Sequence, residues 1–123
     1  MLEINTYTGG IASTNGYACR INESCFVVDA PDGMGAWLDS SGMEPAALLL
    51  THAHFDHVLD AAMIQERWQC PIYAFADPSP ELTLEAMFAA FGPTLSVASY
   101  RVNQHLKEGI AFELSGLPFR IFH

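Results

Sequence analysis

The most informative segment of this 123-residue sequence is Thr51-His52-Ala53-His54-Phe55-Asp56-His57. It holds most of the chain's five histidines and one aspartate. In an extended segment, residues two apart point the same way, so His52 and His54 can approach one metal ion together. If the chain then turns, Asp56 and His57 point elsewhere and can bind a second ion. Imidazole and carboxylate ligands without a thiolate suit zinc, and also manganese or iron.

This HxHxDH spacing predicts hydrolytic chemistry. Two metal ions about 3.5–4 Å apart can share a hydroxide and hold it deprotonated at neutral pH. Such a hydroxide attacks ester-like carbonyls or phosphodiesters. Because a histidine binds metal only when its imidazole is neutral, the metal affinity should fall below about pH 6. The alternative is a solvated polar loop without metal, in which three histidines and an acid lie together with nothing to use them.

The sequence on either side of the motif predicts an α/β fold. The apolar run Ala46–Leu50 is short and flanked by breakers, which favours a strand buried on both faces, and such a strand implies layers on both sides of its sheet. Apolar spacing predicts a helix over Asp60–Gln69, and Ile72–Phe75 is predicted to be the next strand. This strand–helix–strand order indicates a right-handed parallel crossover.

Turn residues and local alternation predict the remaining elements. Asp32 is expected to cap a short helix that ends near Gly42. The other predicted elements are a strand over Leu2–Tyr7, a hairpin of Tyr17–Ile21 and Cys25–Val28, a helix over Glu81–Phe91, and a final hairpin of Ile110–Leu114 and Pro118–Phe122. The length of the chain, without repeats or linkers, indicates a single domain over residues 1–123.

Composition and charge exclude several classes of protein. Half of the residues are apolar and 15% are charged, whereas a disordered chain needs low hydrophobicity and high charge. No apolar run approaches the roughly 20 residues that span a bilayer, so no membrane partner is expected. The net charge is −9 and the five basic residues are scattered, which argues against nucleic acid as a partner. The expected partner is a small-molecule substrate.

The cysteines indicate a reducing compartment. Cys19, Cys25 and Cys70 are odd in number and form no CxxC pair, so buried free thiols in a cytoplasmic protein are expected. The N-terminus lacks the basic and apolar segments of a signal peptide, which supports the same expectation. The alternative is a bridge between Cys19 and Cys25 across the predicted hairpin.

The motif, preceded by Leu48-Leu49-Leu50, resembles the signature of the metallo-β-lactamase superfamily. Further segments in the order typical of that family are Asn15-Gly16-Tyr17, Val27-Val28-Asp29-Ala30-Pro31, Pro71-Ile72-Tyr73 and the hairpin from Leu114 to His123. The overall pattern is most similar to that of small glyoxalase II-like (hydroxyacylglutathione hydrolase-like) hydrolases. The resemblance implies half of a four-layer αββα sandwich, a mixed sheet flanked by helices, with the metals at one edge between the sheets.

The same resemblance implies roles for the motif residues. His52 and His54 would bind the first metal and Asp56 and His57 the second, with Asp56 also the catalytic residue. The resemblance implies two divalent metal ions, which would be zinc, with iron or manganese as alternatives. These ions would hold a hydroxide that attacks the substrate carbonyl, and they would stabilise the oxyanion. Asp29 would either tie the motif loop in place or be merely a turn residue.

The sequence departs from the family pattern at two places. Leu59-Asp60 stand where members often have Gly-Gly, and Asp60 is expected to cap the following helix instead. A further histidine, a bridging aspartate and a final histidine, which the family takes from its later half, have no candidate here. His123 is expected to lie a few residues before such a ligand rather than to be one. His105 lies in a polar stretch and is expected at the surface.

The predicted function is hydrolysis of a thioester or related ester by a metal-dependent, glyoxalase II-like enzyme, of which this chain is the N-terminal half. A lactonase or a mononuclear-iron sulfur dioxygenase with a similar motif stays open. The alternative of another kind is a non-catalytic half-domain that binds metal weakly or needs a partner chain to complete its site. Because the chain stops within a predicted hairpin, truncation at the C-terminal side is expected. A lone half would expose an apolar sheet face, which predicts self-association or poor solubility.

Overall fold

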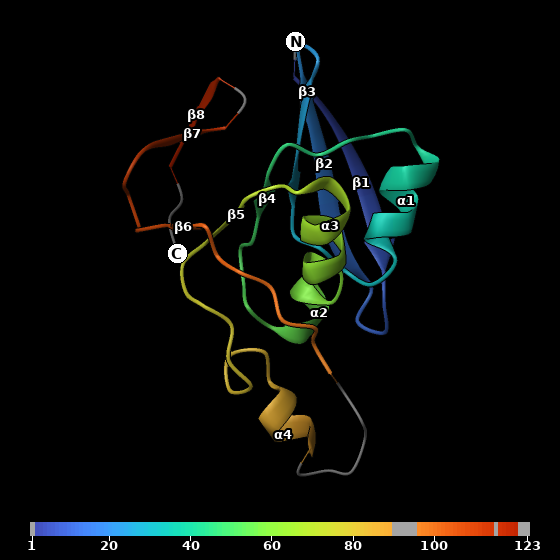
Figure 1. The fold of residues 1–123 in the computed structure, drawn as a ribbon, viewed down its shortest axis with the longest axis vertical. Coiled ribbons are helices and arrows are strands. Elements are labelled where there is room, and N and C mark those ends of the chain that lie inside the picture. Colours follow the sequence, from blue (N-terminus) through green and yellow to red (C-terminus); the bar gives the residue numbers. More distant parts are fainter. Residues whose placement is uncertain (1, 90–95, 115, 121–123) are drawn as a thin grey trace.

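A mixed six-stranded sheet organises the structure, a computed structural model that describes residues 2–89, 96–114 and 116–120 (Figure 1). The strands β1 (Glu3–Gly9), β2 (Thr14–Ile21) and β3 (Ser24–Val28) form an antiparallel meander. The short strands β4 (Leu48–Leu49), β5 (Ile72–Ala74) and β6 (Gln104–His105) follow in parallel, in the spatial order β1-β2-β3-β4-β5-β6. The predicted α/β class and the parallel crossover from β4 to β5 are confirmed.

The three leucines before the motif are buried on both faces of the sheet. Leu48 and Leu50 are 0% and 2% exposed and belong to the larger core cluster. Leu49, which points the opposite way, is 4% exposed and belongs to the smaller cluster. Because successive side chains of a strand alternate between faces, an unbroken apolar run requires cover on both sides. The residue pattern before the motif therefore predicted the layering correctly.

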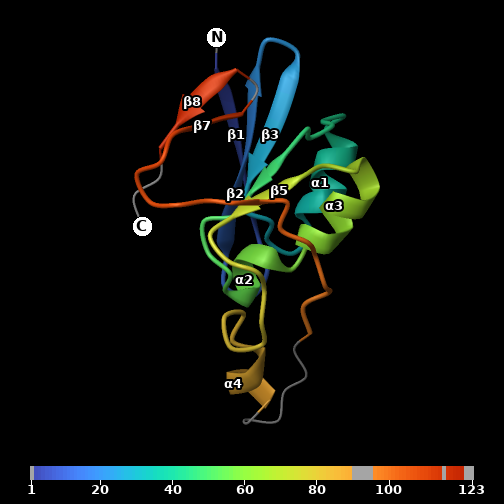
Figure 2. The same cartoon turned by 60° about the vertical axis from the view of Figure 1, so that its left-hand side comes forward.

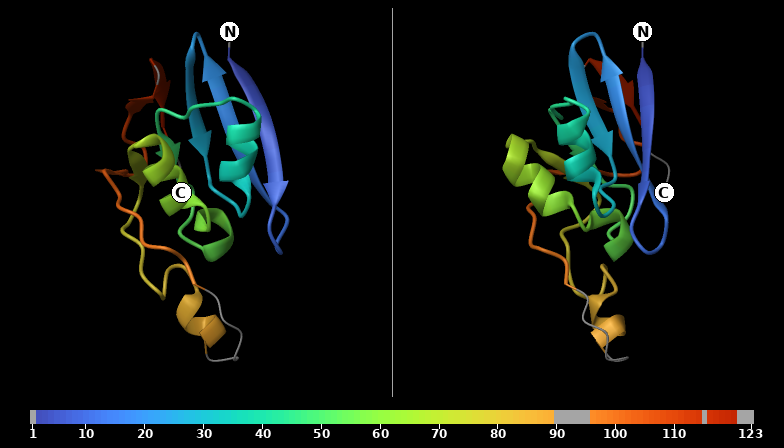
Figure 3. Two further views of the ribbon diagram at one scale, coloured as in Figure 1. Left: turned by 45° about the vertical axis from the view of Figure 1, so that its right-hand side comes forward. Right: turned by 90° about the vertical axis from the view of Figure 1, so that its right-hand side faces the viewer.

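Helices cover one face of this sheet. Figures 2 and 3 show α1 (Met34–Ser40) and α3 (Ala61–Trp68) side by side on that face, with the single turn α2 (Phe55–Val58) at the end of α3. The larger core lies beneath them and includes Met34, Leu38 and Ile64, each 0% exposed. The short helix α4 (Glu85–Ala89) lies beyond the end of the sheet, away from α1 and α3.

A two-stranded hairpin lies against the opposite face. Figure 2 shows β7 (Phe112–Leu114) and β8 (Leu117–Phe119) on the side of the sheet away from α1 and α3. The Phe119 ring meets the Phe26 ring edge-on, with the ring centroids 5.3 Å apart. Several large side chains on this face stay only partly buried; they include Tyr17, Tyr73 and Phe75. This face is therefore covered less completely than the face beneath the helices.

One predicted helix cap is wrong, and the other is confirmed in its position but makes no side-chain capping bond. The helix α1 begins after Gly33, which has φ 89°, and within the described residues the Asp32 side chain makes no capping bond to it. A Cβ at Gly33 would collide with the Tyr7 hydroxyl, so this left-handed position needs glycine. Asp60 is the N-cap residue of α3, as predicted, but its carboxylate accepts a hydrogen bond of 2.8 Å from the Gly35 N–H of α1 instead of capping α3. The Asp60 side chain turns toward α1 because the two helices pack side by side.

Other predicted boundaries are too long. Within the described residues, the helix predicted over Glu81–Phe91 begins later, at Glu85, and is helical to Ala89, whereas residues 90 and 91 lie outside the described residues. The final hairpin is present with shorter strands, and Ile121, Phe122 and His123 also lie outside the described residues.

The three cysteines are buried free thiols, as predicted. Cys25 belongs to the larger core cluster and Cys19 to the smaller one, so the two thiols lie on opposite faces of the sheet and cannot form the alternative bridge. Within the part of the chain that the structure describes, every helix is too short or too polar to cross a membrane.

Candidate metal-binding site

The histidine motif lies in the loop that leaves β4 at its carboxyl end. Since β4 and β5 are parallel, their following loops leave the same edge of the sheet, where ligand sites of α/β folds commonly form. His54 is the residue that precedes α2, with extended φ and ψ of −61° and 145°, and Asp56 and His57 lie within that helical turn. The predicted change from extended chain to turn is confirmed.

The structure brings the four predicted residues into one cluster. The ring centroid of His52 lies 4.9 Å from that of His57 and 5.8 Å from that of His54. The His57 Nε2 lies 3.5 Å from the Asp56 Oδ2. His52 and His54 are exposed, whereas Asp56 and His57 are partly buried. The cluster therefore faces solvent on the side of the first two histidines.

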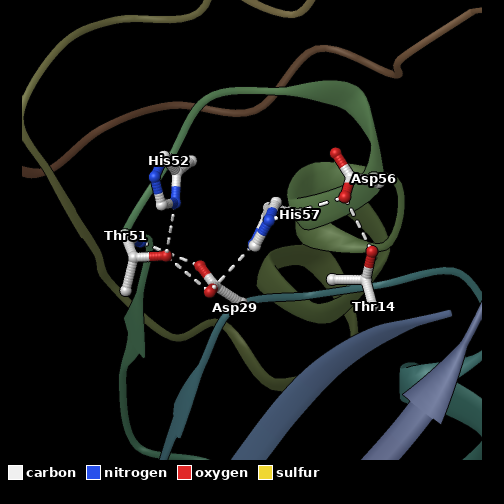
Figure 4. A network of polar contacts seen from close by, with 6 residues as sticks. All are labelled: Thr14, Asp29, Thr51, His52, Asp56 and His57. Carbon is white, nitrogen blue, oxygen red and sulfur yellow. Dashed lines mark hydrogen bonds and ion pairs between the residues drawn. The ribbon is translucent and has the colours of Figure 1, made fainter. Parts of the chain in front are cut away.

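Asp29 ties this cluster to the end of β3. It is 4% exposed, and its Oδ1 accepts a hydrogen bond of 2.8 Å from the Thr51 N–H (Figure 4). Its Oδ2 lies 2.6 Å from the Thr51 hydroxyl and 3.0 Å from the His57 Nδ1. Of the two roles considered for Asp29, the structure confirms that it holds the motif loop in place.

The Nδ1 of His57 lies 3.0 Å from Asp29 and its Nε2 lies 3.5 Å from Asp56, so the shorter contact favours the tautomer in which Nδ1 carries the proton. A carboxylate only accepts hydrogen bonds, so the Nδ1 of His57 must be the donor to Asp29. In the neutral imidazole the Nε2 then keeps its lone pair. A carboxylate behind a histidine is the usual way in which proteins orient a histidine ligand toward a metal.

Thr51 extends the same effect to His52. The single hydroxyl proton of Thr51 is donated to Asp29, so the hydroxyl oxygen can only accept from the His52 Nδ1, which lies 3.1 Å away. The Nε2 of His52 therefore also keeps its lone pair when the ring is neutral. One buried carboxylate thus orders two of the predicted ligands, one directly and one through Thr51.

Thr14 supports Asp56 from the start of β2. The Thr14 hydroxyl is buried and donates a hydrogen bond of 2.7 Å to the Asp56 Oδ2. Sequence reasoning missed Thr14 and the role of Thr51. Thr51 directly precedes His52 and could have been examined for that reason. Thr14 is 42 residues from Asp56, and no local pattern connects the two.

The donor set fits divalent metal ions in its chemistry. It offers three imidazoles and one carboxylate, which are ligands that zinc and iron accept at such sites. Among the described residues, however, no three His, Cys, Asp or Glu side chains are arranged so that they could hold one ion together. The assignment of His52, His54, Asp56 and His57 as ligands stays a prediction.

His105 lies apart from this cluster and pairs with another residue. The His105 Nε2 lies 2.9 Å from the Asp77 Oδ1, and both side chains are largely exposed. The expectation that His105 is a surface residue is confirmed. His123 lies outside the described residues.

The sequence matches the metallo-beta-lactamase superfamily over residues 10–123. Since this match covers nearly the whole chain, the chain belongs to that superfamily, whose members are mostly metal-dependent hydrolases and typically bind two metal ions.

Curated relatives of this chain are named for different activities. The probable metallo-hydrolase YqgX of Bacillus subtilis is 35% identical over 68 residues, which cover 52% of this chain and 32% of that protein. The hydroxyacylglutathione hydrolase of Thiobacillus denitrificans is 36% identical over 93 residues, which cover 62% of this chain and 36% of that protein. A ribonuclease Z of Mycobacterium sp. is 29% identical over 125 residues, covering 83% and 43%. The chain thus spans about a third to two fifths of these relatives.

Solved structures show the same fold. The BLEG-1 B3 metallo-beta-lactamase matches with a TM-score of 0.78 at 21% identity, covering 100% of this chain and 61% of that chain. TTHA1623, solved in a di-iron-bound form, matches with a TM-score of 0.68 at 30% identity, and the match covers 86% of this chain and 55% of that chain. The predicted fold, part of a metallo-β-lactamase sandwich, is confirmed.

Proposed function

We propose that this chain carries part of the active site of a metal-dependent hydrolase that cleaves a thioester or a related ester. The observation that carries the proposal is the network around Asp29, which fixes the ring orientations of His52 and His57 through their Nδ1 atoms within one cluster. Preorganised nitrogen donors of this kind are typical of metal sites and have no use in a merely solvated loop.

The proposed roles follow the sequence motif. His52 and His54 would bind one ion, and Asp56 and His57 would bind the other, with Asp56 also the catalytic residue. When bound, the ions supply Lewis-acid polarisation of the substrate carbonyl and activation of a water molecule. Asp29 and Thr51 hold the ring orientations of His52 and His57, and Thr14 holds Asp56. Zinc is the first choice of metal, and the di-iron form of TTHA1623 supports iron as the alternative.

Thioester cleavage is supported by the relative named as a hydroxyacylglutathione hydrolase. The net charge of −9 opposes a nucleic-acid substrate, although a ribonuclease Z is among the relatives. The three free buried thiols support a cytoplasmic location.

Hydrolysis of a hydroxyacylglutathione by the zinc- or iron-loaded protein tests this proposal. We expect turnover that a chelator abolishes and that restored metal recovers, and we expect Asp56→Asn to lose it. Inertness toward all thioesters with two ions bound would contradict the proposal.

A second candidate is a metal-binding half-site without activity of its own. It is favoured by the arrangement of the described residues, among which no three His, Cys, Asp or Glu side chains could hold one ion together. Calorimetric titration with zinc separates the two candidates, because a half-site should bind weakly and with open coordination positions. Two ions bound tightly by this chain alone would exclude the half-site.

A further inference from the structure

A pocket of about 250 Å³ lies beside the two exposed histidines of the motif. His52 and His54 line it where the loop after β4 begins, and Phe75 and Ala76 line it from the loop after β5. The two loops leave the same edge of the sheet (Figure 1). The pocket therefore opens beside the two histidines that are proposed to bind one of the metal ions.

The walls of the pocket are mostly apolar. They include Leu50, Ala53, Ala74, Phe75 and Leu82. The volume is somewhat below the range of about 300–1,000 Å³ that is typical for drug-sized ligands, so the pocket suits a smaller group. Glu81 is the charged residue among the lining side chains besides the histidines, and it disfavours an anion there.

Tyr100 adds one polar group to this lining. Its side chain is 7% exposed, and within the described part of the chain its hydroxyl has no hydrogen-bond partner. Buried hydroxyls are paired in most structures, so an unpaired one on a residue that lines a pocket is a candidate hydrogen-bond donor to a ligand atom. Burial, and to a smaller extent the charge of Asp77, raises the pKa of Tyr100 to about 12, which keeps its proton available for donation.

We propose that this pocket binds the acyl group of the substrate, and that it selects a short, neutral acyl group with one hydrogen-bonding atom for the Tyr100 hydroxyl. The selection follows from the limited volume, the apolar walls and Glu81, which together exclude long or anionic acyl groups. The inference rests on the proposed function, because it is the predicted metal ligands His52 and His54 that make the occupant an acyl group.

Binding of small probes to the metal-free chain tests the pocket without any turnover. The probes are butyramide, which is neutral and carries a carbonyl, butyrate, which is its anionic counterpart, and chlorobutane, which lacks a strong hydrogen-bonding atom. Amide chemical shifts are followed by NMR. We expect butyramide to shift the amides of Ala53, Phe75 and Ala76 saturably, and butyrate to bind at least about fivefold more weakly.

Three variants locate the binding. Ala76→Phe places a ring in the pocket from an exposed position and should weaken butyramide binding at least about tenfold. Ala36→Phe is the matched control on the exposed surface of α1 and should leave it unchanged. Tyr100→Phe should weaken butyramide binding about three- to tenfold, the usual effect of one neutral hydrogen bond, and leave chlorobutane binding unchanged. The NMR spectrum itself reports whether each variant is folded.

Several outcomes would overturn the inference. They are shifts that do not saturate at the pocket residues, butyrate binding as tightly as butyramide, or Ala76→Phe and Ala36→Phe behaving alike. An equal effect of Tyr100→Phe on butyramide and chlorobutane would remove the role of the hydroxyl. If butyramide binds as expected but the metal-loaded protein cleaves no thioester, the proposed function is wrong and the pocket is confirmed. If the metal-loaded protein cleaves a thioester but no probe binds, the pocket is wrong and the proposed function is confirmed.

Discussion

At the residue scale, Asp29 is the group on which the candidate site depends most. It lies outside the motif, at the end of β3, with a left-handed φ of 63°. Its two oxygens hold the Thr51 N–H, the Thr51 hydroxyl and the His57 ring. Loss of this carboxylate should therefore disturb two histidines at once without removing a proposed ligand.

Asp29→Asn should weaken zinc binding about 10- to 100-fold, because partners that orient a histidine ligand usually contribute that much to metal affinity. Competition with a chromophoric chelator measures the affinity, and ring ¹⁵N shifts of His57 show whether its proton has moved from Nδ1. Asp77→Asn is the matched control, since it removes the carboxylate paired with His105 at the surface. Equal affinities for the two variants would show that Asp29 does not orient a ligand.

Thr51→Val should lower the free energy of unfolding by about 1–3 kcal/mol, because the buried Asp29 carboxylate loses a donor that valine cannot replace. Thr51→Ser keeps the hydroxyl and should retain most of the stability. Urea unfolding of the metal-free chain measures both. If Ser and Val destabilise equally, the hydroxyl contributes nothing and the methyl group accounts for the effect.

At the element scale, Asp60 connects the two helices that cover the sheet. Its carboxylate accepts from the Gly35 N–H in the first turn of α1, and its backbone carbonyl accepts from the Ile64 N–H in α3. The side chain is thus a cap for α1 that comes from another element. Gly35 allows α1 and α3 to lie close together at this point, because a Cβ at position 35 would collide with the end of the Met63 side chain on α3.

Asp60→Ala should cost about 1 kcal/mol of stability, the typical loss when a helix N-terminus loses its side-chain acceptor. Asp60→Asn keeps an acceptor oxygen and should cost less. Urea unfolding at neutral pH compares the two variants. The same cost for Ala and Asn would mean that the charge, and not the hydrogen bond to Gly35, stabilises α1.

The same carboxyl also predicts a pH dependence. Burial raises the pKa of Asp60 above its ordinary 3.8, and this outweighs the backbone hydrogen bonds from Gly35 and Gly33, which lower it. The folded state holds the Asp60 proton more tightly than the unfolded state does. The contribution of Asp60 to the free energy of unfolding is therefore fully present below pH 3.8, the ordinary pKa, and is lost as the pH rises through the raised pKa of the folded state.

Asp60→Asn lacks this titration, so its stability relative to the unchanged protein should improve as the pH rises from acidic to neutral. Urea unfolding midpoints over that range measure the difference. A difference that stays constant with pH, or that changes in the opposite direction, would contradict the raised pKa.

At the scale of the whole molecule, the two faces of the sheet differ in their cover. The helices bury one face, whereas the other carries the β7–β8 hairpin and several partly buried aromatic side chains. Ile4 lies on this second face, since it pairs with Cys19 of the smaller core cluster, and it is 57% exposed. An apolar surface of this kind favours association.

We expect the 123-residue chain to self-associate through this face. Ile4→Glu should shift light scattering toward a monomer of 13.5 kDa, whereas Ile11→Glu, the same change at a loop residue that is 88% exposed, should not. Salt should strengthen the association, because it screens the repulsion between chains of net charge −9. A monodisperse monomer at high salt would count against the prediction.

The local sequence pattern predicted the structure correctly where residues close together along the chain determine the backbone conformation. The unbroken run Ala46–Leu50 predicted a strand covered on both sides, and the spacing of His52, His54, Asp56 and His57 predicted an extended segment followed by a turn. In both cases the periodicity of the backbone alone determines where the side chains point. Element ends were predicted less well, because the packing of the helices determines them.

The tertiary structure alone assigned the supporting contacts. Asp29 reaches Thr51 across 22 residues, Asp60 reaches Gly35 across 25, and Thr14 reaches Asp56 across 42. The sequence alone also allowed hydrogen bonds to groups nearer along the chain. Asp60, for example, was expected to cap the helix that directly follows it. Only the packing of strands and helices selects among such partners, because a hydrogen bond requires contact in space and its strength does not depend on separation along the chain.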